Sequence, residues 1–393
     1  MQKLASLFIL VLIGSIFSPG CSQAAPYQPP IENLVIRPDD RLPAVTARSA
    51  VIMEASTGTI LYARDMDARR YPASTTKMMT LIVALERGNL DDIVTVSDHA
   101  AQTGGSTLWL EPGQQVRLLD LLYGMMMVSG NDATVAVAEH IAGNVDDFAK
   151  MMTDKAKEIG AADTSFVNTS GLPDERHYTT AHDLALIAAY GYKNPMFEQI
   201  VSTKEKELTW TKYADGQTVR NENQMLWLYP GANGVKTGYT DDAGRCLVAA
   251  ANRDGVQLIT VVLDSLYMWN DSIAMLNYGF SQVQTKRLVP KGTIVQSVDV
   301  TAGKRAQLSL ETQEDLDIPV FDGEELPVTQ VYKGPTKIDF PVEKGRVIGE
   351  LVVLYDGREI ASTPLAAAES VGRKSFFLML YQEVRDLLQM TGI

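Results

Sequence analysis

The period with which hydrophobic and polar residues alternate changes along the chain, and these changes predict its elements. Ser49–Glu54 and Thr59–Ala63 flank a turn-type cluster, so a β-hairpin is expected there. An apolar helix is predicted over Lys77–Glu86, since Pro72 suits the first turn of a helix. Further helices are predicted over 117–141, 145–159 and Thr180–Tyr190, and strands over Arg245–Asn252 and Gln257–Leu263.

Strands at both ends of a helical middle predict an α/β (α+β) sandwich whose sheet is built from both ends of this region. After residue 286 the pattern changes to short alternating runs separated by Gly and Pro, which is typical of a small all-β module. The strands expected in it are Thr293–Val300, Arg305–Leu310, Leu316–Val320, Pro327–Val331 and Val347–Tyr355.

The N-terminus has the pattern of a secretory signal peptide. One lysine precedes an apolar run from Leu4 to Phe17, which is shorter than the roughly 20 residues of a spanning helix. Small residues follow, so we expect cleavage after Ala24 and export of the mature protein. Two alternatives stay open, an uncleaved membrane anchor and a lipoprotein signal at Cys21.

The C-terminus predicts an amphipathic helix. Apolar residues recur at helical spacing in Ser375–Ile393, namely Phe376, Phe377, Leu380, Val384, Leu387 and Leu388. Such a helix can lie in a membrane interface or dock on its own domain. The expected organisation is a signal peptide (1–24), a linker (25–44), an α/β domain (45–285), a β-rich accessory domain (286–371) and a terminal helix (372–393).

Composition excludes several classes of function. The chain has 393 residues and a net charge of −13, which argues against nucleic-acid binding because that needs a basic patch. Two cysteines cannot form a disulfide framework. The four histidines form no Cys/His ligand pattern, so no metal and no cofactor is expected.

Three short motifs occur once each and in order: Ser74–Lys77 (SxxK), Ser129–Asn131 (SxN) and Lys236–Gly238 (KTG). Each is weak alone, since SxxK and SxN occur by chance roughly once in a chain of this length. The three motifs together are a stronger signal, because they occur in a fixed order and each lies at the end of a predicted helix or strand.

The spacing in the first motif fits nucleophilic catalysis. Residues three apart at a helix start share a face, so the Ser74 hydroxyl and the Lys77 amine can form a hydrogen bond. A lysine can act as a base only if burial or a second cation, such as Lys236, lowers its pKa. The helix N-terminus would favour a developing oxyanion. The alternative is an N-cap serine followed by a surface lysine.

With these motifs the sequence resembles the penicillin-recognising serine enzymes, and among them the low-molecular-weight D-alanyl-D-alanine carboxypeptidases. The resemblance covers nearly the whole mature chain, including the β-rich module and the terminal helix. In this family the terminal helix holds the enzyme on the outer face of the cytoplasmic membrane. The segments that carry the likeness are TGGSTLWLEPGQQ (103–115), FVNTSGLPDERHYTTAHDLALIA (166–188) and GVKTGYT (234–240).

The resemblance implies catalytic roles for four residues. Ser74 attacks the carbonyl between the two D-alanines of a peptidoglycan stem peptide, and Lys77 is its base. Ser129 relays a proton to the leaving D-alanine, and Asn131 holds the substrate amide and positions Lys77. Water then releases the acyl-enzyme, whereas β-lactams acylate Ser74 as mimics of D-Ala-D-Ala.

The resemblance also implies that Lys236, Thr237, Gly238 and Tyr239 bind the substrate. Lys236 and Thr237 bind the terminal carboxylate, and the oxyanion hole uses the backbone N–H groups of Ser74 and Tyr239.

Two departures from the family are visible. Tyr239 stands where some members have His, and the stretch 264–271 lacks an Arg that supports the carboxylate-binding lysine in some members.

Other residues favour ordinary structural interpretations. His177 and His182 are expected in a structural or rim role, and Cys246 as a buried thiol. A β-lactamase would need a carboxylate that activates the deacylating water, and Asp174 and Glu175 occur in an unsuitable context. A non-catalytic wall-binding module is the third hypothesis, but it has no chemical need for the intact motifs.

Overall fold

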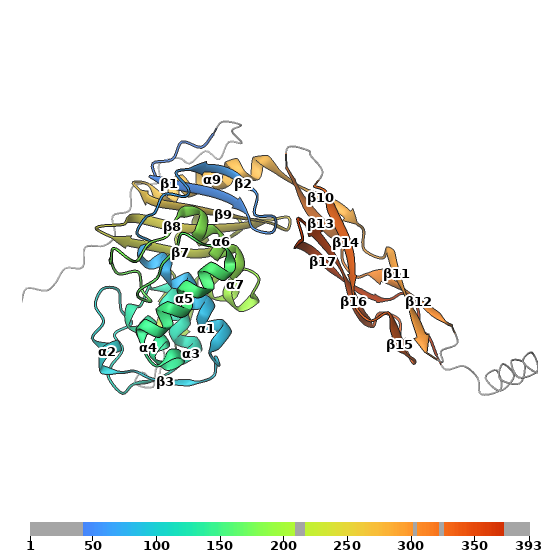
Figure 1. Cartoon of the computed structure of the whole chain (residues 1–393), viewed down its shortest axis with the longest axis horizontal. Helices are drawn as coiled ribbons and strands as arrows, with labels where there is room; N and C mark the ends of the chain where they lie inside the picture. Colours follow the sequence, from blue (N-terminus) through green and yellow to red (C-terminus); the bar gives the residue numbers. More distant parts are fainter. Residues whose placement is uncertain (1–41, 209–216, 302–304, 322–325, 373–393) are drawn as a thin grey trace, which may run out of the picture. The chain divides into compact units, whose positions relative to one another are not determined.

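The computed structural model describes residues 42–208, 217–301, 305–321 and 326–372 (Figure 1). The predicted signal peptide, nearly all of the linker and nearly all of the terminal helix lie outside these residues. No helix among the described residues is long and apolar enough to cross a membrane.

A five-stranded antiparallel sheet is the centre of the α/β part. Its order is β2 (Ile60–Arg64), β1 (Ser49–Glu54), β9 (Val256–Ser265), β8 (Gly244–Arg253) and β7 (Ala232–Thr240). The hairpin at the start of the sequence therefore pairs with a strand about 200 residues later, and Val51 lies opposite Val261. This confirms the sheet predicted from both ends of the region.

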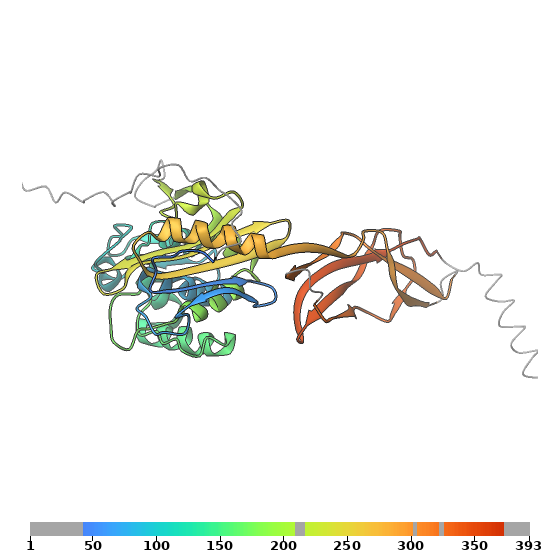
Figure 2. The ribbon, with the colours of Figure 1, turned by 90° about the horizontal axis from the view of Figure 1, so that it is seen from above.

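The strands β1, β8 and β9 in the middle of the sheet are buried on both faces, and helices lie on each side of the sheet (Figures 1 and 2). On β1, Ala50 and Ile52 belong to the core beneath α9 (Met268–Gln282), whereas Val51 and Met53 belong to the larger core with the other helices. Successive side chains on a strand point to opposite faces, so a strand buried on both faces reads as an unbroken apolar run. The result is a three-layer domain.

The helical layer contains α1 (Lys77–Arg87), α3 (Leu118–Met127), α4 (Asn131–Ala142), α5 (Val145–Ile159), α6 (Ala181–Gly191) and α7 (Pro195–Ser202). The single helix predicted over 117–141 is wrong, because it breaks into α3 and α4 at Val128–Gly130. Ser129 has a left-handed φ of 63°, which a continuous helix cannot contain. The helices predicted over Lys77–Glu86, 145–159 and Thr180–Tyr190 are confirmed as α1, α5 and α6.

Shorter elements complete the α/β part, and all were missed from the sequence. They are α2 (Asp98–Ala101), β3 (Ile93–Thr95) paired with β4 (Gln115–Arg117), β5 (Glu205–Leu208) paired with β6 (Gln217–Arg220), and α8 (Met225–Leu228). Each contains only three or four residues, which is too short for a hydrophobic period to appear.

The C-terminal part is all β with its own core, as predicted. β10 (Val283–Val289) pairs with β13 (Leu316–Phe321). A second sheet has the order β14 (Val328–Lys333), β16 (Val347–Tyr355), β17 (Arg358–Ala367), β12 (Gln307–Thr312), β11 (Ile294–Thr301) and β15 (Lys337–Asp339). Their inward residues, such as Leu308, Leu310 and Val353, form a separate hydrophobic cluster.

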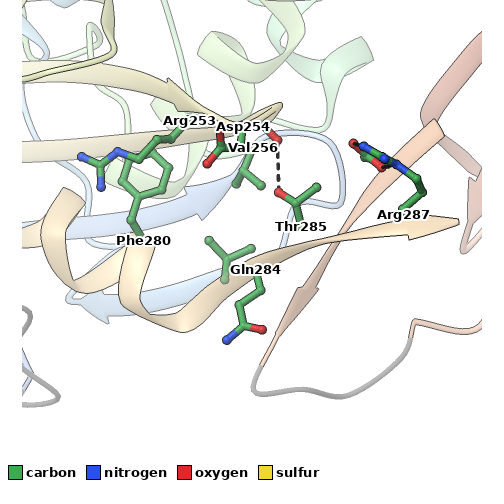
Figure 3. Close-up of a pocket in the computed structure, with 9 residues that line it drawn as sticks. Arg253, Asp254, Val256, Phe280, Gln284, Thr285 and Arg287 are labelled. Carbon is green, nitrogen blue, oxygen red and sulfur yellow. Dashed lines mark hydrogen bonds and ion pairs between the residues drawn. The ribbon is translucent and has the colours of Figure 1, made fainter. Parts of the chain in front are cut away.

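The chain passes from α9 into β10 without a loop. The Thr285 hydroxyl donates a hydrogen bond of 3.1 Å to the carbonyl of Asp254, in the turn between β8 and β9 (Figure 3). Next to it lies a surface pocket of about 670 Å³, whose lining includes Arg253 and Phe280.

Candidate active site

Ser74 lies in a short 3₁₀ turn, η1 (Ala73–Thr76), which continues directly into α1. Ala73 has a φ of 47°, a conformation that residues other than glycine rarely adopt. Backbone of this kind persists only where the surroundings fix it, and it is concentrated at functional sites. Here it turns the chain so that Ser74 stands at the first turn of the helical segment.

Lys77 is completely buried, and three oxygens surround its amine. Its Nζ lies 2.8 Å from Ser74 Oγ, 2.7 Å from Asn131 Oδ1 and 2.9 Å from the carbonyl oxygen of Ser170. Asn131 Oδ1 and the carbonyl can only accept hydrogen bonds, whereas the hydroxyl can also donate. The contacts suit a charged amine that donates to all three oxygens, and equally a neutral amine with two N–H donors and a lone pair toward the Ser74 hydroxyl.

The electrostatics of the site favour that neutral form. Burial lowers the pKa of Lys77 well below its ordinary value, and the positive charge of Lys236 lowers it further. The negative charges of Glu222 and Asp132 oppose this shift but do not overcome it. A buried amine of lowered pKa beside a hydroxyl is the arrangement that general-base activation of a serine requires.

The second motif lies between α3 and α4, beside the amine of Lys77. Asn131 bridges two segments, because its Oδ1 accepts from Lys77 while its Nδ2 donates to the carbonyl of Gly104 at 2.7 Å. Its backbone N–H also donates to the carbonyl of Ser106 at 2.7 Å. Ser129, two residues earlier, is 4% exposed and has a left-handed backbone.

Asp132 fixes the loop that precedes α3, and the sequence analysis did not single it out. Its buried carboxylate accepts the backbone N–H groups of Leu108, Leu110 and Ala133 at 2.9–3.1 Å. The acidic residue directly after the SxN motif was the signal that could have found it. Because Asn131 and Asp132 hold the same loop, its position is coupled to that of the Lys77 amine.

The segment 165–178 closes the other side of Lys77. The Ser170 carbonyl contacts the amine, and Gly171 packs so tightly that an added Cβ would lie 1.8 Å from the Ala73 oxygen. His177 is buried, and its Nδ1 accepts the N–H of Val167 at 3.1 Å. Its Nε2 must then carry the proton and donate to Thr76 Oγ1 at 2.8 Å. This is a structural role, as expected from the sequence.

His182 and Cys246 lie apart from these contacts. His182 Nδ1 is 3.2 Å from a carboxylate oxygen of Asp67 near the surface. Cys246 is a free, buried thiol, as predicted, and burial raises its pKa to about 12.

The third motif lies on the edge strand β7, which packs against η1. Lys236 is 1% exposed, and its Nζ donates to the carbonyl of Thr237 at 3.1 Å. Burial lowers the pKa of Lys236 to about 8. At Gly238, an added Cβ would lie 3.0 Å from the backbone nitrogen of Ser74, so only glycine lets the strand approach this closely. Tyr239 is 60% exposed, and its hydroxyl donates to Asp241 at 2.9 Å.

The fold and this cluster are together those of the penicillin-recognising serine enzymes. A mixed α/β domain presents a serine at the first turn of a buried helix, a buried lysine three residues later in contact with it, and an edge strand with a second lysine beside them.

Comparison with known proteins identifies the family. Residues 37–266 match the family model of D-alanyl-D-alanine carboxypeptidase, and residues 284–373 match that of the penicillin-binding protein 5 C-terminal domain. The chain is 37% identical to D-alanyl-D-alanine carboxypeptidase DacF of Bacillus subtilis, over 86% of this chain and 90% of the relative. It therefore belongs to the D-alanyl-D-alanine carboxypeptidase family, serine peptidases of peptidoglycan metabolism.

Two further similarities bear on the fold. The crystal structure of penicillin-binding protein 5 from Haemophilus influenzae superposes with a TM-score of 0.59 at 34% identity, covering 85% of this chain and 99% of that one. A D-alanyl-D-alanine carboxypeptidase of Streptomyces sp. strain K15 is 36% identical over 61% of this chain and 89% of its own length. That relative is therefore similar to only part of this chain.

Proposed function

We propose that the enzyme removes the terminal D-alanine from peptidoglycan stem pentapeptides through an acyl-enzyme on Ser74. The observation that carries this proposal is the buried Lys77 amine 2.8 Å from the Ser74 hydroxyl, with its other contacts directed at acceptors. Lys77 takes the hydroxyl proton as Oγ attacks the carbonyl between the two D-alanines. The free D-alanine leaves, and water then hydrolyses the ester.

Lys236 and Thr237 bind the terminal carboxylate of the substrate, since a buried cation beside a hydroxyl suits a carboxylate. The backbone N–H groups of Ser74 and Tyr239 stabilise the oxyanion. The close approach of Gly238 to the Ser74 nitrogen supports this pairing, because it brings the two backbone segments together. Ser129 delivers the proton to the leaving amine, and Asn131 holds the substrate amide.

β-Lactams acylate Ser74 in this proposal because they imitate D-Ala-D-Ala. A β-lactamase, the runner-up, must activate the deacylating water with a suitable base. Asp174 instead forms an ion pair of 2.9 Å with Arg176, and its pKa is lowered to about 2 by that partner. Among the described residues, no carboxylate contacts Ser74 or Lys77, which favours the carboxypeptidase over the β-lactamase.

The test is release of D-alanine from a stem pentapeptide that ends in D-Ala-D-Ala. We expect turnover by the protein and none by Ser74→Ala, with both proteins giving the same circular dichroism spectrum. Absence of free D-alanine from the unaltered protein would refute the proposal and favour the non-catalytic wall-binding module. Rapid turnover of penicillin would instead favour the β-lactamase.

The same proposal includes a location. The N-terminal signal directs export, the catalytic domain spans 45–285 and the β-rich domain 286–371, and the terminal helix attaches the enzyme to the outer face of the cytoplasmic membrane. With a net charge of −13, attachment must come mainly from apolar residues such as Phe376 and Phe377.

Deletion of residues 375–393 is expected to release the protein from membranes at ordinary salt. Continued attachment would point to the N-terminus or to a lipidated Cys21.

A further inference from the structure

Glu222 is an acidic residue that the backbone holds beside the SxN motif. It follows β6, and its backbone N–H donates to the carbonyl of Met127 at 2.8 Å, so it lies against the end of α3 just before the SxN motif. On both sides it is flanked by buried asparagines. Asn221 Nδ2 donates to the carbonyl of Thr203, and Asn223 Oδ1 accepts the N–H of Met225. The backbone at 222 is therefore held firmly.

The carboxylate of Glu222 differs from the other acidic groups near the site. Asp132 is buried and accepts three backbone N–H groups, Asp174 pairs with Arg176, and Asp241 accepts the Tyr239 hydroxyl. Glu222 is exposed, and within the described ranges no hydrogen-bond donor or cation pairs with its carboxylate. Its negative charge nevertheless acts on both Lys77 and Lys236.

The negative charge of Glu222 is unfavourable for binding the carboxylate end of the substrate. The substrate ends in a carboxylate that Lys236 must attract, and an exposed carboxylate nearby weakens that attraction. A negative group at the edge of such a site is useful if another part of the same substrate is positive. In stem peptides, the residue before D-Ala-D-Ala carries a free ω-amine when the peptide is not cross-linked, and an amide in its place when it is.

We infer that Glu222 is a specificity-determining residue that binds the protonated ω-amine of the stem-peptide residue preceding D-Ala-D-Ala. This inference rests on the proposed function. It makes the enzyme prefer stems that are not cross-linked, because acylation of that amine removes its positive charge. The preference is electrostatic, so it decreases as ionic strength rises.

The test compares two substrates that differ only in this charge: Nα-acetyl-L-Lys-D-Ala-D-Ala and its Nε-acetylated form. We expect kcat/KM of the full protein to be about fivefold higher for the free amine, the size typical of a partly exposed ion pair. Glu222→Gln is expected to bring this ratio close to 1, and Glu222→Lys to invert it. Glu207→Gln is the matched control, since Glu207 is exposed on β5 and is not among the groups acting on either lysine.

The outcomes distinguish failure of the Glu222 role from failure of the carboxypeptidase activity itself. Equal kcat/KM for both substrates in the unaltered protein, or an unchanged ratio in Glu222→Gln, would overturn the role of Glu222 and leave the carboxypeptidase activity standing. Release of D-alanine from neither substrate would overturn the proposed function, and the specificity with it. Acylation by a fluorescent penicillin verifies that each variant is folded.

Discussion

Lys236 combines burial with a need for positive charge, and this sets a limit on activity at high pH. Only 1% of its surface is exposed, and burial lowers its pKa to about 8. In the proposed mechanism only the protonated form attracts the substrate carboxylate. Lys77 has the opposite requirement, because its neutral form is the base. Activity therefore needs one buried lysine charged and the other neutral.

The first prediction concerns this pair. The kcat/KM for D-alanine release is expected to fall as pH rises through about 8, when Lys236 loses its proton. Lys236→Arg keeps the charge at every accessible pH, so its descending limb should move up by about 2 pH units or more, although its maximal rate is lower. The pH profiles of the two proteins provide the measurement. A descending limb that stays near pH 8 in the variant would assign it to another group.

At the residue scale, the sequence predicts contacts between residues that are close together along the chain. The i, i+3 spacing of Ser74 and Lys77 is enough to expect their contact, because helix geometry alone brings them together. The roles of Asp132 and Gly238 could not be predicted in this way. Asp132 binds backbone groups more than 20 residues earlier, and Gly238 is constrained by Ser74, more than 160 residues earlier. Such contacts depend on the tertiary fold.

At the element scale, the segment 165–178 is important because it supplies a wall of the site without regular structure. Its Ser170 carbonyl contacts Lys77, and His177 ties the segment to η1 through Thr76. His177 can make both of its hydrogen bonds only when neutral, since Nδ1 accepts from Val167. Burial lowers its pKa from 6.5 to about 4.

The second prediction follows from the sign of this shift. Below pH 6.5 the unfolded chain takes up a proton at His177 that the folded protein refuses until about pH 4. The free energy of unfolding is therefore expected to decrease between these values, by about 3 kcal/mol from this residue. Urea unfolding at pH 7 and pH 4.5 measures it.

Matched variants isolate this contribution from that of the other titrating groups. His177→Gln is expected to lose less stability between pH 7 and 4.5 than the unaltered protein, although it is less stable at pH 7. His182→Gln is the control for the loss of an imidazole, because His182 lies near the surface and makes neither of these buried contacts. If the pH dependence of His177→Gln matches that of the unaltered protein, the structural role assigned to the neutral imidazole is incorrect.

Elements were predictable where apolar residues kept a helical period, as in α1 and α5, or formed an unbroken run, as in β9. β7 was not predicted as a strand, because Lys236 and two glycines interrupt its apolar pattern. The break between α3 and α4 was missed for a related reason. The apolar residues on both sides of Val128–Gly130 continue one helical period, and only the left-handed conformation of Ser129 separates them.

At the scale of the whole molecule, the α/β part contains every residue of the proposed mechanism. Its sheet joins β1 and β2 to β7, β8 and β9, and its cores use residues from 45 to 283 together with Phe321 at the edge. The β-rich part has a hydrophobic cluster of its own. The Streptomyces relative matches 61% of this chain over 89% of its own length, so most of that relative corresponds to only part of this chain.

The third prediction is that residues 38–283 fold and act without the rest of the chain. On a soluble pentapeptide, kcat/KM is expected to stay within about threefold of that of the full-length protein, because the fragment keeps the catalytic core except for Phe321 at its edge. Thermal unfolding and D-alanine release provide the measurement. A fragment that is insoluble or inactive would mean that the β-rich part is needed to complete the catalytic fold.

The identity of the nucleophile is the claim on which the proposed mechanism depends most. Mass spectrometry of the protein after brief exposure to benzylpenicillin, followed by proteolysis, locates the acylated residue. We predict one adduct, on the peptide containing Ser74, and none in Ser74→Ala. An adduct on Ser129, or persistent acylation of Ser74→Ala, would contradict the assignment of Ser74 as nucleophile and Lys77 as its base.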